Sequence, residues 1–157
     1  MRMRRKKHLD ERLLNCKEYI ITPEISEKNI NISNAVKKYL PINELFEKAA
    51  PLYLEIGCGK GGFACEFAKQ NPDINLLAVE KTANVLVSGA EQAQKMGLKN
   101  LKFLSCPAEY LPSYLKENTV ERIFLNFSCP FPKAKYAAHR LTAPNFLVIS
   151  VENTDII

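Results

Sequence analysis

Three glycines alternate with other residues in the segment Leu-Glu-Ile-Gly-Cys-Gly-Lys-Gly-Gly, which runs from Leu54 to Gly62. Glycine reaches backbone angles that are closed to other residues, and it lets a ligand approach the main chain. An apolar run at 51–56 precedes the glycines and an apolar-periodic helical pattern follows them, which predicts a strand, a tight turn and a helix. The helix after such a turn directs free N–H groups at whatever lies over it. This combination predicts a site for a nucleotide-like cofactor.

The spacing of the glycines fits two cofactor patterns. Gly57, Gly59 and Gly62 match the G-x-G-x-x-G fingerprint of dinucleotide binding. Gly57, Gly59 and Gly61, preceded by an acidic residue, instead match the turn of class I S-adenosylmethionine methyltransferases. The acidic residue is Glu55, and its carboxylate suits a cationic cofactor with an amino group better than a pyrophosphate. The second pattern is therefore favoured, and a glycine turn that binds nothing is the remaining alternative.

Alternating strands and helices position this turn. Apolar runs predict strands at 51–56, 75–79, 101–104 and 120–127, and helical patterns lie at 61–70 and 82–96. A short turn or helix is expected at 108–115. Thr142 is a candidate cap for a last helix. Near-continuous apolar strands between helices are typical of a parallel sheet that is covered on both faces. We therefore expect an α/β fold with helices on both faces of a parallel sheet.

Polar side chains and special backbone gather where the predicted strands end. Ligands of open α/β sheets bind beyond the carboxyl ends of the strands, and four segments meet there: the Gly57 turn, Glu80, 106–109 and 126–133. Glu80 follows Gly57 by 23 positions, the usual separation of an acid that holds ribose hydroxyls. An exposed carboxylate at the end of a strand is the alternative interpretation. Given the turn, the ribose role is favoured.

The excess positive charge lies at the beginning of the chain. Residues 1–17 carry seven basic and two acidic side chains, which equals the net charge of +5 of all 157 residues. The remaining residues are therefore neutral as a group. A short basic arm on a neutral domain is typical of a contact with a polyanion. A solvated terminus that aids solubility explains the arm alone equally well.

A second group of basic side chains lies in the turn-rich segment 128–140, on the same predicted sheet edge as the cofactor turn. A solvated loop is one explanation. Together with the arm, contacts to the phosphates of a nucleic acid explain the loop better. The candidate phosphate contacts of the loop and the arm are Lys133, Lys135, Arg140, Arg4 and Arg5.

Length and composition are those of one globular domain. The chain is 46% hydrophobic and 25% charged, and we expect a basic arm and linker at 1–33 followed by the domain at 34–157. Five cysteines without a C-x-x-C pair predict neither a metal site nor a disulfide framework, and free thiols suit a reducing cytoplasm. No signal peptide and no membrane span are predicted from the sequence.

Further segments extend these motifs into one recognisable pattern. The matching segments are Met-Arg-Met-Arg-Arg-Lys at the start, 54–61, Gln70-Asn71-Pro72-Asp73, Val79-Glu80-Lys81, Leu125-Asn126-Phe127, Pro130-x-Pro132-Lys133 and Arg140-Leu141-Thr142. In this order, over nearly the whole chain, they resemble the bacterial tRNA (guanine-N7-)-methyltransferases. The resemblance implies a Rossmann-like class I methyltransferase fold with strand order 3-2-1-4, S-adenosylmethionine as cofactor and a guanine of tRNA as methyl acceptor.

The resemblance also implies a set of site residues. For the cofactor they are Glu55, Gly57, Gly59, Gly61, Glu80, Pro107, Ala108 and Asn126. Cys129 stands where the family has an aspartate, and Phe131 where it has a tryptophan. Pro107 replaces the usual Asp or Asn beside the cofactor adenine. The family continues past position 157 with further strands, so the chain resembles a C-terminally truncated and partly degenerate member whose fourth strand lacks a neighbour. Such an edge favours self-association.

The expected chemistry explains why the position of Cys129 matters. Guanine N7 carries an in-plane lone pair and no proton, so methyl transfer needs no general base there, and the enzyme mainly aligns the acceptor with the methyl group. A carboxylate can hold the Watson–Crick edge of the base by charge-assisted hydrogen bonds, whereas a thiol is a weak donor and acceptor. Two hypotheses remain open: a cytoplasmic tRNA methyltransferase, and an inactive remnant that binds RNA, cofactor or a partner. An NAD-binding module is disfavoured by Glu55.

Overall fold

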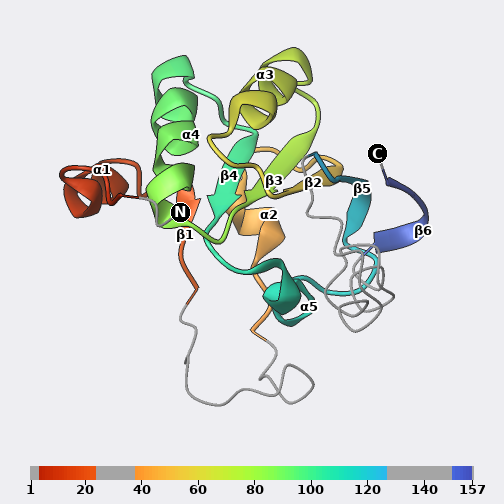
Figure 1. Ribbon diagram of the computed structural model, residues 1–157. Helices are drawn as coiled ribbons and strands as arrows, with labels where there is room; N and C mark the ends of the chain where they lie inside the picture. Colours follow the sequence, from red (N-terminus) through yellow and green to blue (C-terminus); the bar gives the residue numbers. More distant parts are fainter. Residues whose placement is uncertain (1–3, 24–37, 127–149, 157) are drawn as a thin grey trace.

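The computed structural model describes residues 4–23, 38–126 and 150–156, the last of these as backbone only. Its strands are β1 (Ile20–Ile21), β2 (Leu52–Ile56), β3 (Asn75–Val79), β4 (Leu101–Leu104), β5 (Val120–Phe124) and β6 (Ser150–Ile156). They form one sheet in the order β1-β4-β3-β2-β5-β6, and all pairings are parallel (Figure 1). The predicted strands therefore lie side by side in the expected order.

Helices cover both faces of the sheet. One face carries α3 (Gly62–Gln70) and α4 (Ala83–Met96), and α1 (Leu9–Asn15) lies against the outer side of α4 (Figure 1). The other face carries α2 (Ile42–Leu45), the 3-10 turn η2 (Ala108–Tyr110) and α5 (Leu111–Tyr114). The expected helices at 61–70 and 82–96 are confirmed to within a residue, and Gly97 ends α4 in the left-handed conformation.

The strand side chains divide between two apolar cores. All five residues of β3 are buried. Leu76 and Ala78 pack under α3 and α4, whereas Leu77 and Val79 pack against the opposite layer. This alternation follows from the two-residue period of a strand, and it explains why the sequence of β3 is apolar at successive positions. The predicted sheet with two covered faces is confirmed.

The expectation that β5 lacks a neighbour is wrong. Strand β6 pairs with β5 in parallel, with Val120 opposite Ser150 and Ile123 opposite Ile156. The register shifts between Val120 and Arg122, so this pairing is irregular. Strand edges offer unpaired N–H and C=O groups to any extended segment, and the end of the chain supplies one. Thr142, the expected start of a last helix, lies outside the described residues.

The N-terminal segment does not stand apart from the domain, as an arm would. Arg12 donates to both carboxylate oxygens of Glu91 on α4, at 2.6 and 2.7 Å. Gln94, one turn further along α4, donates to the carbonyl oxygen of Asn15 at 2.9 Å. Strand β1 then continues the sheet beside β4. Residues 4–23 are thus docked on the domain, while the predicted boundary at 33–34 lies outside the described residues and stays a prediction.

Two glycines allow α4 to pack against the loop between β2 and α3. A Cβ on Gly61 would come within 2.8 Å of the Cα of Gly89 and 3.0 Å of the Phe103 ring. A Cβ on Gly89 would meet the same ring at 2.8 Å and the carbonyl oxygen of Lys60 at 3.0 Å. Phe103 is fully buried, so neither the ring nor the backbone has room to move. The contact requires glycine at both positions.

We expect Gly89→Ala to lower the free energy of unfolding by about 1–3 kcal/mol, because the added methyl group overpacks this contact. Gly62→Ala is the matched control, since no heavy atom lies within 4 Å of its Cβ position and alanine favours the helix that begins there. Urea unfolding of both variants measures the difference. Equal stability of the two variants would contradict the packing argument.

Candidate cofactor site

The glycine turn has the backbone geometry that its sequence predicts. Gly57, Gly59 and Gly61 have φ angles of 78°, 56° and 74°, all in the left-handed region that favours glycine. The N–H groups of Gly57 and Cys58 both donate to the carbonyl oxygen of Val79, at 2.8 and 3.0 Å. This pair of hydrogen bonds ties the start of the turn to the end of the neighbouring strand β3. Backbone hydrogen bonds therefore fix the start of the turn.

Glu80 lies beside this turn, as the sequence predicts. Its Oε2 accepts a hydrogen bond from the Gly59 N–H at 3.3 Å, and its Oε1 accepts one from the Thr82 N–H at 3.0 Å. The carboxylate thus links the turn to the residue before α4. Each oxygen keeps a further lone pair for a ligand. A carboxylate oriented in this way can accept hydrogen bonds from a ribose without first being ordered.

Glu55 is a buried carboxylate with one oxygen that has no partner in the described part of the chain. Only 2% of the residue is exposed. Its Oε1 accepts a hydrogen bond from Asn126 Nδ2 at 3.3 Å, while Oε2 is fully buried and unsatisfied there. Burial raises the pKa of Glu55 to about 7, and the hydrogen bond from Asn126 opposes this shift. An unpaired buried acceptor is costly, and a cationic donor would remove that cost.

Asn126 closes the site on the side of β5. Its backbone oxygen lies 4.0 Å from the position that a Cβ on Gly57 would take. Its side chain reaches Glu55 at the same time. Asn126, which follows β5, therefore lies beside both Glu55 of β2 and the glycine turn after β2. The structure thus brings together Glu55, the glycine turn, Glu80 and Asn126, all of which the sequence predicted for the cofactor.

Pro107 and Ala108 follow β4 at the same edge of the sheet. The N–H of Glu80 donates to the carbonyl oxygen of Leu104 at 3.1 Å, which places the end of β4 next to Glu80. Pro107 precedes η2, and both Pro107 and Ala108 are half-buried. Neither side chain can donate a hydrogen bond. They can form only an apolar wall for a bound ring.

Arg4 and Arg5, the predicted substrate contacts of the arm, have exposed side chains. The side chain of Arg5 donates to Asp10 Oδ2 at 2.5 Å, and the carbonyl oxygen of Arg4 accepts from Asn84 Nδ2 at 3.1 Å. The other predicted catalytic and substrate residues lie outside the described part of the chain: Cys129, Phe131, Lys133, Lys135 and Arg140. Their roles stay predictions.

The surface of α4 that receives the arm was not predicted from the sequence. Helix α4 offers the segment 4–16 a polar row whose members are spaced by three or four residues and therefore share one helix face: Asn84, Ser88, Glu91 and Gln94. The same spacing is visible in the sequence. It was not informative alone, because a polar row is the normal solvent face of an amphipathic helix.

The described ranges contain no candidate membrane-spanning helix, metal site or reactive thiol. None of their helices has the length and hydropathy to cross a bilayer, and no group of three or more His, Cys, Asp or Glu there is arranged to hold a metal ion. Burial raises the pKa of Cys65 to about 11 and that of Cys106 to about 12. Such thiols stay protonated and are poor nucleophiles at neutral pH.

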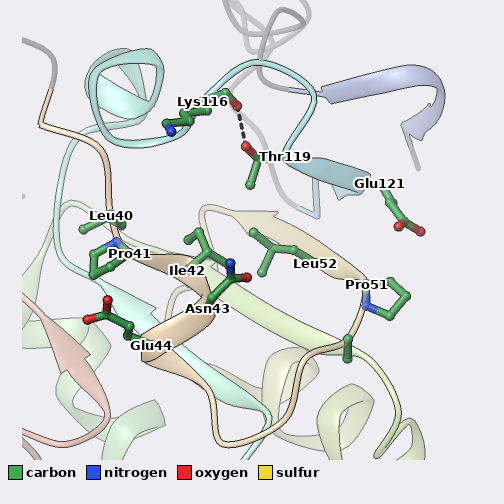
Figure 2. A pocket seen from close by; sticks show the side chains of 11 residues that line it. Leu40, Pro41, Ile42, Asn43, Glu44, Pro51, Leu52, Lys116, Thr119 and Glu121 are labelled. Atoms are coloured by element: carbon green, nitrogen blue, oxygen red, sulfur yellow. Dashed lines mark hydrogen bonds between the residues drawn. The ribbon is translucent and has the colours of Figure 1, made fainter.

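A cavity of about 620 Å³ lies at the opposite edge of the sheet (Figure 2). It is lined by the start of β2 at Leu52, by Ile42 and Asn43 of α2, and by Thr119 before β5. These residues are at the amino ends of the strands, whereas Glu55, Gly57 and Glu80 are at the carboxyl ends. The cavity is therefore not part of the candidate cofactor site.

The strand order, the glycine turn and the two carboxylates together define a Rossmann-like protein of the class I methyltransferase type. A solved 30S ribosomal methyltransferase from an uncultured bacterium shares this fold, with a TM-score of 0.58 and 16% identity over 82% of this chain and 61% of that one. A family model described as "Putative methyltransferase" matches residues 49–153. The chain belongs to this methyltransferase family.

Curated relatives agree with the resemblance seen in the sequence. A tRNA (guanine-N(7)-)-methyltransferase of Macrococcus caseolyticus is 35% identical over 95% of this chain and 65% of its own length. One of Staphylococcus carnosus is 38% identical over 69% of this chain and 51% of its own length. The predicted family relationship is confirmed. The chain spans between about half and two thirds of the length of these two relatives.

The raised pKa of Glu55 predicts how stability depends on pH. Between its ordinary pKa of 4.5 and about 7, the unfolded Glu55 is ionised while the folded one still binds a proton, so stability falls as pH rises through this window. Relative to Glu55→Gln, the wild type should lose about 3 kcal/mol of unfolding free energy between these pH values. Urea unfolding at several pH values measures the difference.

Glu117→Gln is the control for this measurement, because it makes the same change at an exposed position. It should keep the pH dependence of the wild type. If Glu55→Gln also keeps that dependence, the buried carboxyl group is not the one that titrates.

Proposed function

We propose that this chain binds S-adenosylmethionine at the Gly57 turn and transfers its methyl group to N7 of a guanine in tRNA. The observation that carries the proposal is the buried, half-satisfied carboxylate of Glu55 beside three left-handed glycines. A dinucleotide would bring a pyrophosphate to this turn, and a buried carboxylate would repel it. The substrate part of the proposal is supported by the printed names of the relatives, of which the chain spans only a part.

Different residues of the described part would contact different groups of the cofactor. Glu55 would accept a hydrogen bond from the amino group through Oε2, which has no partner among the described residues, and Asn126 keeps the carboxylate oriented. Glu80 would accept from the ribose hydroxyls. Pro107 and Ala108 would contact the adenine through apolar surface alone. The cofactor supplies an electrophilic methyl group, and these residues hold it at the carboxyl edge of the sheet.

Methyl transfer to guanine N7 needs alignment more than acid–base chemistry. The acceptor nitrogen has no proton to lose, so the chain must hold the base in line with the methyl group. We place this role at Cys129, which stands where the family has an aspartate, and we place phosphate contacts at Lys133, Lys135, Arg140, Arg4 and Arg5. A thiol orients a base weakly, which favours a low rate.

An inactive module that binds cofactor, RNA or a partner is the second candidate. It is favoured by the same departures from the family pattern, at Cys129, Phe131 and Pro107. The two candidates share the cofactor site and differ only in methyl transfer. An assay of labelled methyl transfer to tRNA by the 157-residue chain therefore separates them.

Cofactor binding should release a proton from Glu55. The free carboxyl group has a pKa of about 7, and a cationic amino group beside it favours the ionised form. Affinity for S-adenosylhomocysteine, the demethylated product, should therefore rise by up to about tenfold per pH unit below pH 7 and then level off. Calorimetry in buffers with different ionisation enthalpies measures both the affinity and the proton release.

In the same experiment, Glu55→Gln should bind about tenfold or more weakly at pH 7.5 and lose the pH dependence. Glu117→Gln, the exposed control, should match the wild type. Tighter binding of NAD than of S-adenosylhomocysteine by the wild type would contradict the cofactor assignment.

Cys129→Asp should raise methyl transfer to tRNA, because a carboxylate holds the guanine edge by stronger hydrogen bonds than a thiol. We expect a modest gain, since the assay uses a chain that spans about half to two thirds of the length of these relatives. Cys129→Asn is the control, because it adds a polar group without the charge. No transfer by any of these proteins, with cofactor binding intact, would favour the inactive module.

A further inference from the structure

Lys6 is held in one place on the surface of α4. Its backbone N–H donates to Asn84 Oδ1 at 2.7 Å, and its ammonium group donates to the hydroxyl of Ser88, one turn further along the helix. Asn84 also donates to the carbonyl oxygen of Arg4 at 3.1 Å. A lysine on a free arm would sample many positions, whereas this one is fixed at both its backbone and its side-chain end.

Lys60 approaches the same part of α4 from the glycine turn. Its carbonyl oxygen lies 3.0 Å from where a Cβ on Gly89 would be, so its main chain rests on the residue that follows Ser88. Its side chain is exposed. The N-terminal segment and the glycine turn, more than 50 residues apart in sequence, therefore each bring a lysine to adjacent residues of one helix.

The positive charge of this pair is not neutralised within the described part of the chain. Neither Lys6 nor Lys60 forms an ion pair there, and the nearby carboxylate of Glu91 is engaged by both donors of Arg12. Burial lowers the pKa of Lys6 most and Arg12 lowers it further; the attraction of Glu91 opposes both, and the repulsion from Lys60 is the smallest of these contributions. Holding two ammonium groups together without an anion costs free energy, and a bound anion would remove the cost.

We propose that Lys6 and Lys60 grip a single backbone phosphate of the RNA substrate beside the glycine turn. A phosphodiester carries one negative charge, and its oxygens can accept from ammonium groups that arrive from two sides. The bound RNA and the cofactor turn would then both lie against α4, with the N-terminal segment contributing to the RNA contact. This inference rests on the proposed function, because it takes RNA as the substrate.

The carboxylate of the cofactor fits this pair less well. In S-adenosylmethionine the carboxylate and the amino group share one carbon atom. If the amino group reaches Glu55, the carboxylate stays on that side of the turn, next to Asn126 and β5. The main chain of Lys60 lies against α4 instead, on the other side of the turn. The excess charge of the first 17 residues also favours a polyanion over a small molecule.

The test measures tRNA affinity as a function of salt concentration for Lys6→Gln, Lys60→Gln and the double variant. Glutamine keeps a donor for Ser88, so the segment should stay docked. Each single variant should lower the slope of log affinity against log salt by about one. If both lysines hold one phosphate, the double variant should lose no more than either single variant. Two independent contacts would instead lower the slope by about two, and would overturn the shared site.

Lys69→Gln is the matched control, since Lys69 lies in the last turn of α3, at the other end of the helix that starts after the glycine turn. It should leave the slope unchanged. An unchanged slope in the Lys6 and Lys60 variants would overturn the inference. So would weaker binding of S-adenosylhomocysteine to them in calorimetry, because it would assign the pair to the cofactor carboxylate.

The same measurements separate this inference from the proposed function. Suppose that the wild type transfers no methyl group, but the Lys6 and Lys60 variants lower the salt slope of tRNA binding as predicted. This result would contradict the proposed enzymatic activity and support the phosphate site. If the wild type methylates tRNA and the lysine variants keep its salt slope, the enzymatic activity would be supported and the phosphate site contradicted. Protein that binds no tRNA at all would overturn both.

Discussion

Two glycines allow helix α4 to pack directly against the glycine turn. Gly61 and Gly89 approach so closely, over the ring of Phe103, that a single methyl group on either would overlap its neighbour. Interiors are packed without spare volume, so the distance between α4 and the turn depends on this contact. Because α4 in turn carries the N-terminal segment, the contact also determines where Lys6 lies relative to Lys60.

The second constraint is the burial of Glu55. A carboxylate with 2% exposure and only one oxygen satisfied by the described residues is costly for a small domain whose total stability is on the order of 10 kcal/mol. Glu80, by contrast, has hydrogen-bond donors for both oxygens. The two carboxylates of the site are therefore prepared in different ways. Glu80 is oriented in advance, whereas one oxygen of Glu55 has no donor among the described residues, and a ligand with an amino group can supply one.

The fold places the glycine turn, Glu55, Glu80 and Asn126 together at the carboxyl ends of the strands. Parallel strands end on the same side of the sheet, so the residues that follow β2, β3, β4 and β5 meet there although they lie far apart in sequence. The order β4-β3-β2-β5 brings Glu80 to one flank of the glycine turn and Asn126 to the other. The cavity between α2 and the starts of the strands is at the opposite edge. Position within the sheet thus separates this cavity from the candidate cofactor site.

The sequence by itself determined the features that depend on neighbouring residues. Apolar runs located β2, β3, β4 and β5, because a strand buried on both faces needs apolar residues at successive positions. Glycine spacing located the turn, because left-handed angles at Gly57, Gly59 and Gly61 exclude most other residues. The spacing between Gly57 and Glu80 also identified the second carboxylate before any contact was visible.

Only the tertiary structure decided the features that depend on distant segments. Thr142 was a candidate cap for a last helix, but the last segment that the structure describes, Ser150–Ile156, pairs with the open edge of β5 as β6. The basic start of the chain looked like a free arm, because the row on α4 that binds it resembles an ordinary solvent face. The pKa of Glu55 near 7 depends on burial by strands on either side and on one contact from Asn126. These contacts join segments that are far apart in sequence. A local sequence pattern shows that a segment can pair, but it does not show which distant segment becomes its partner.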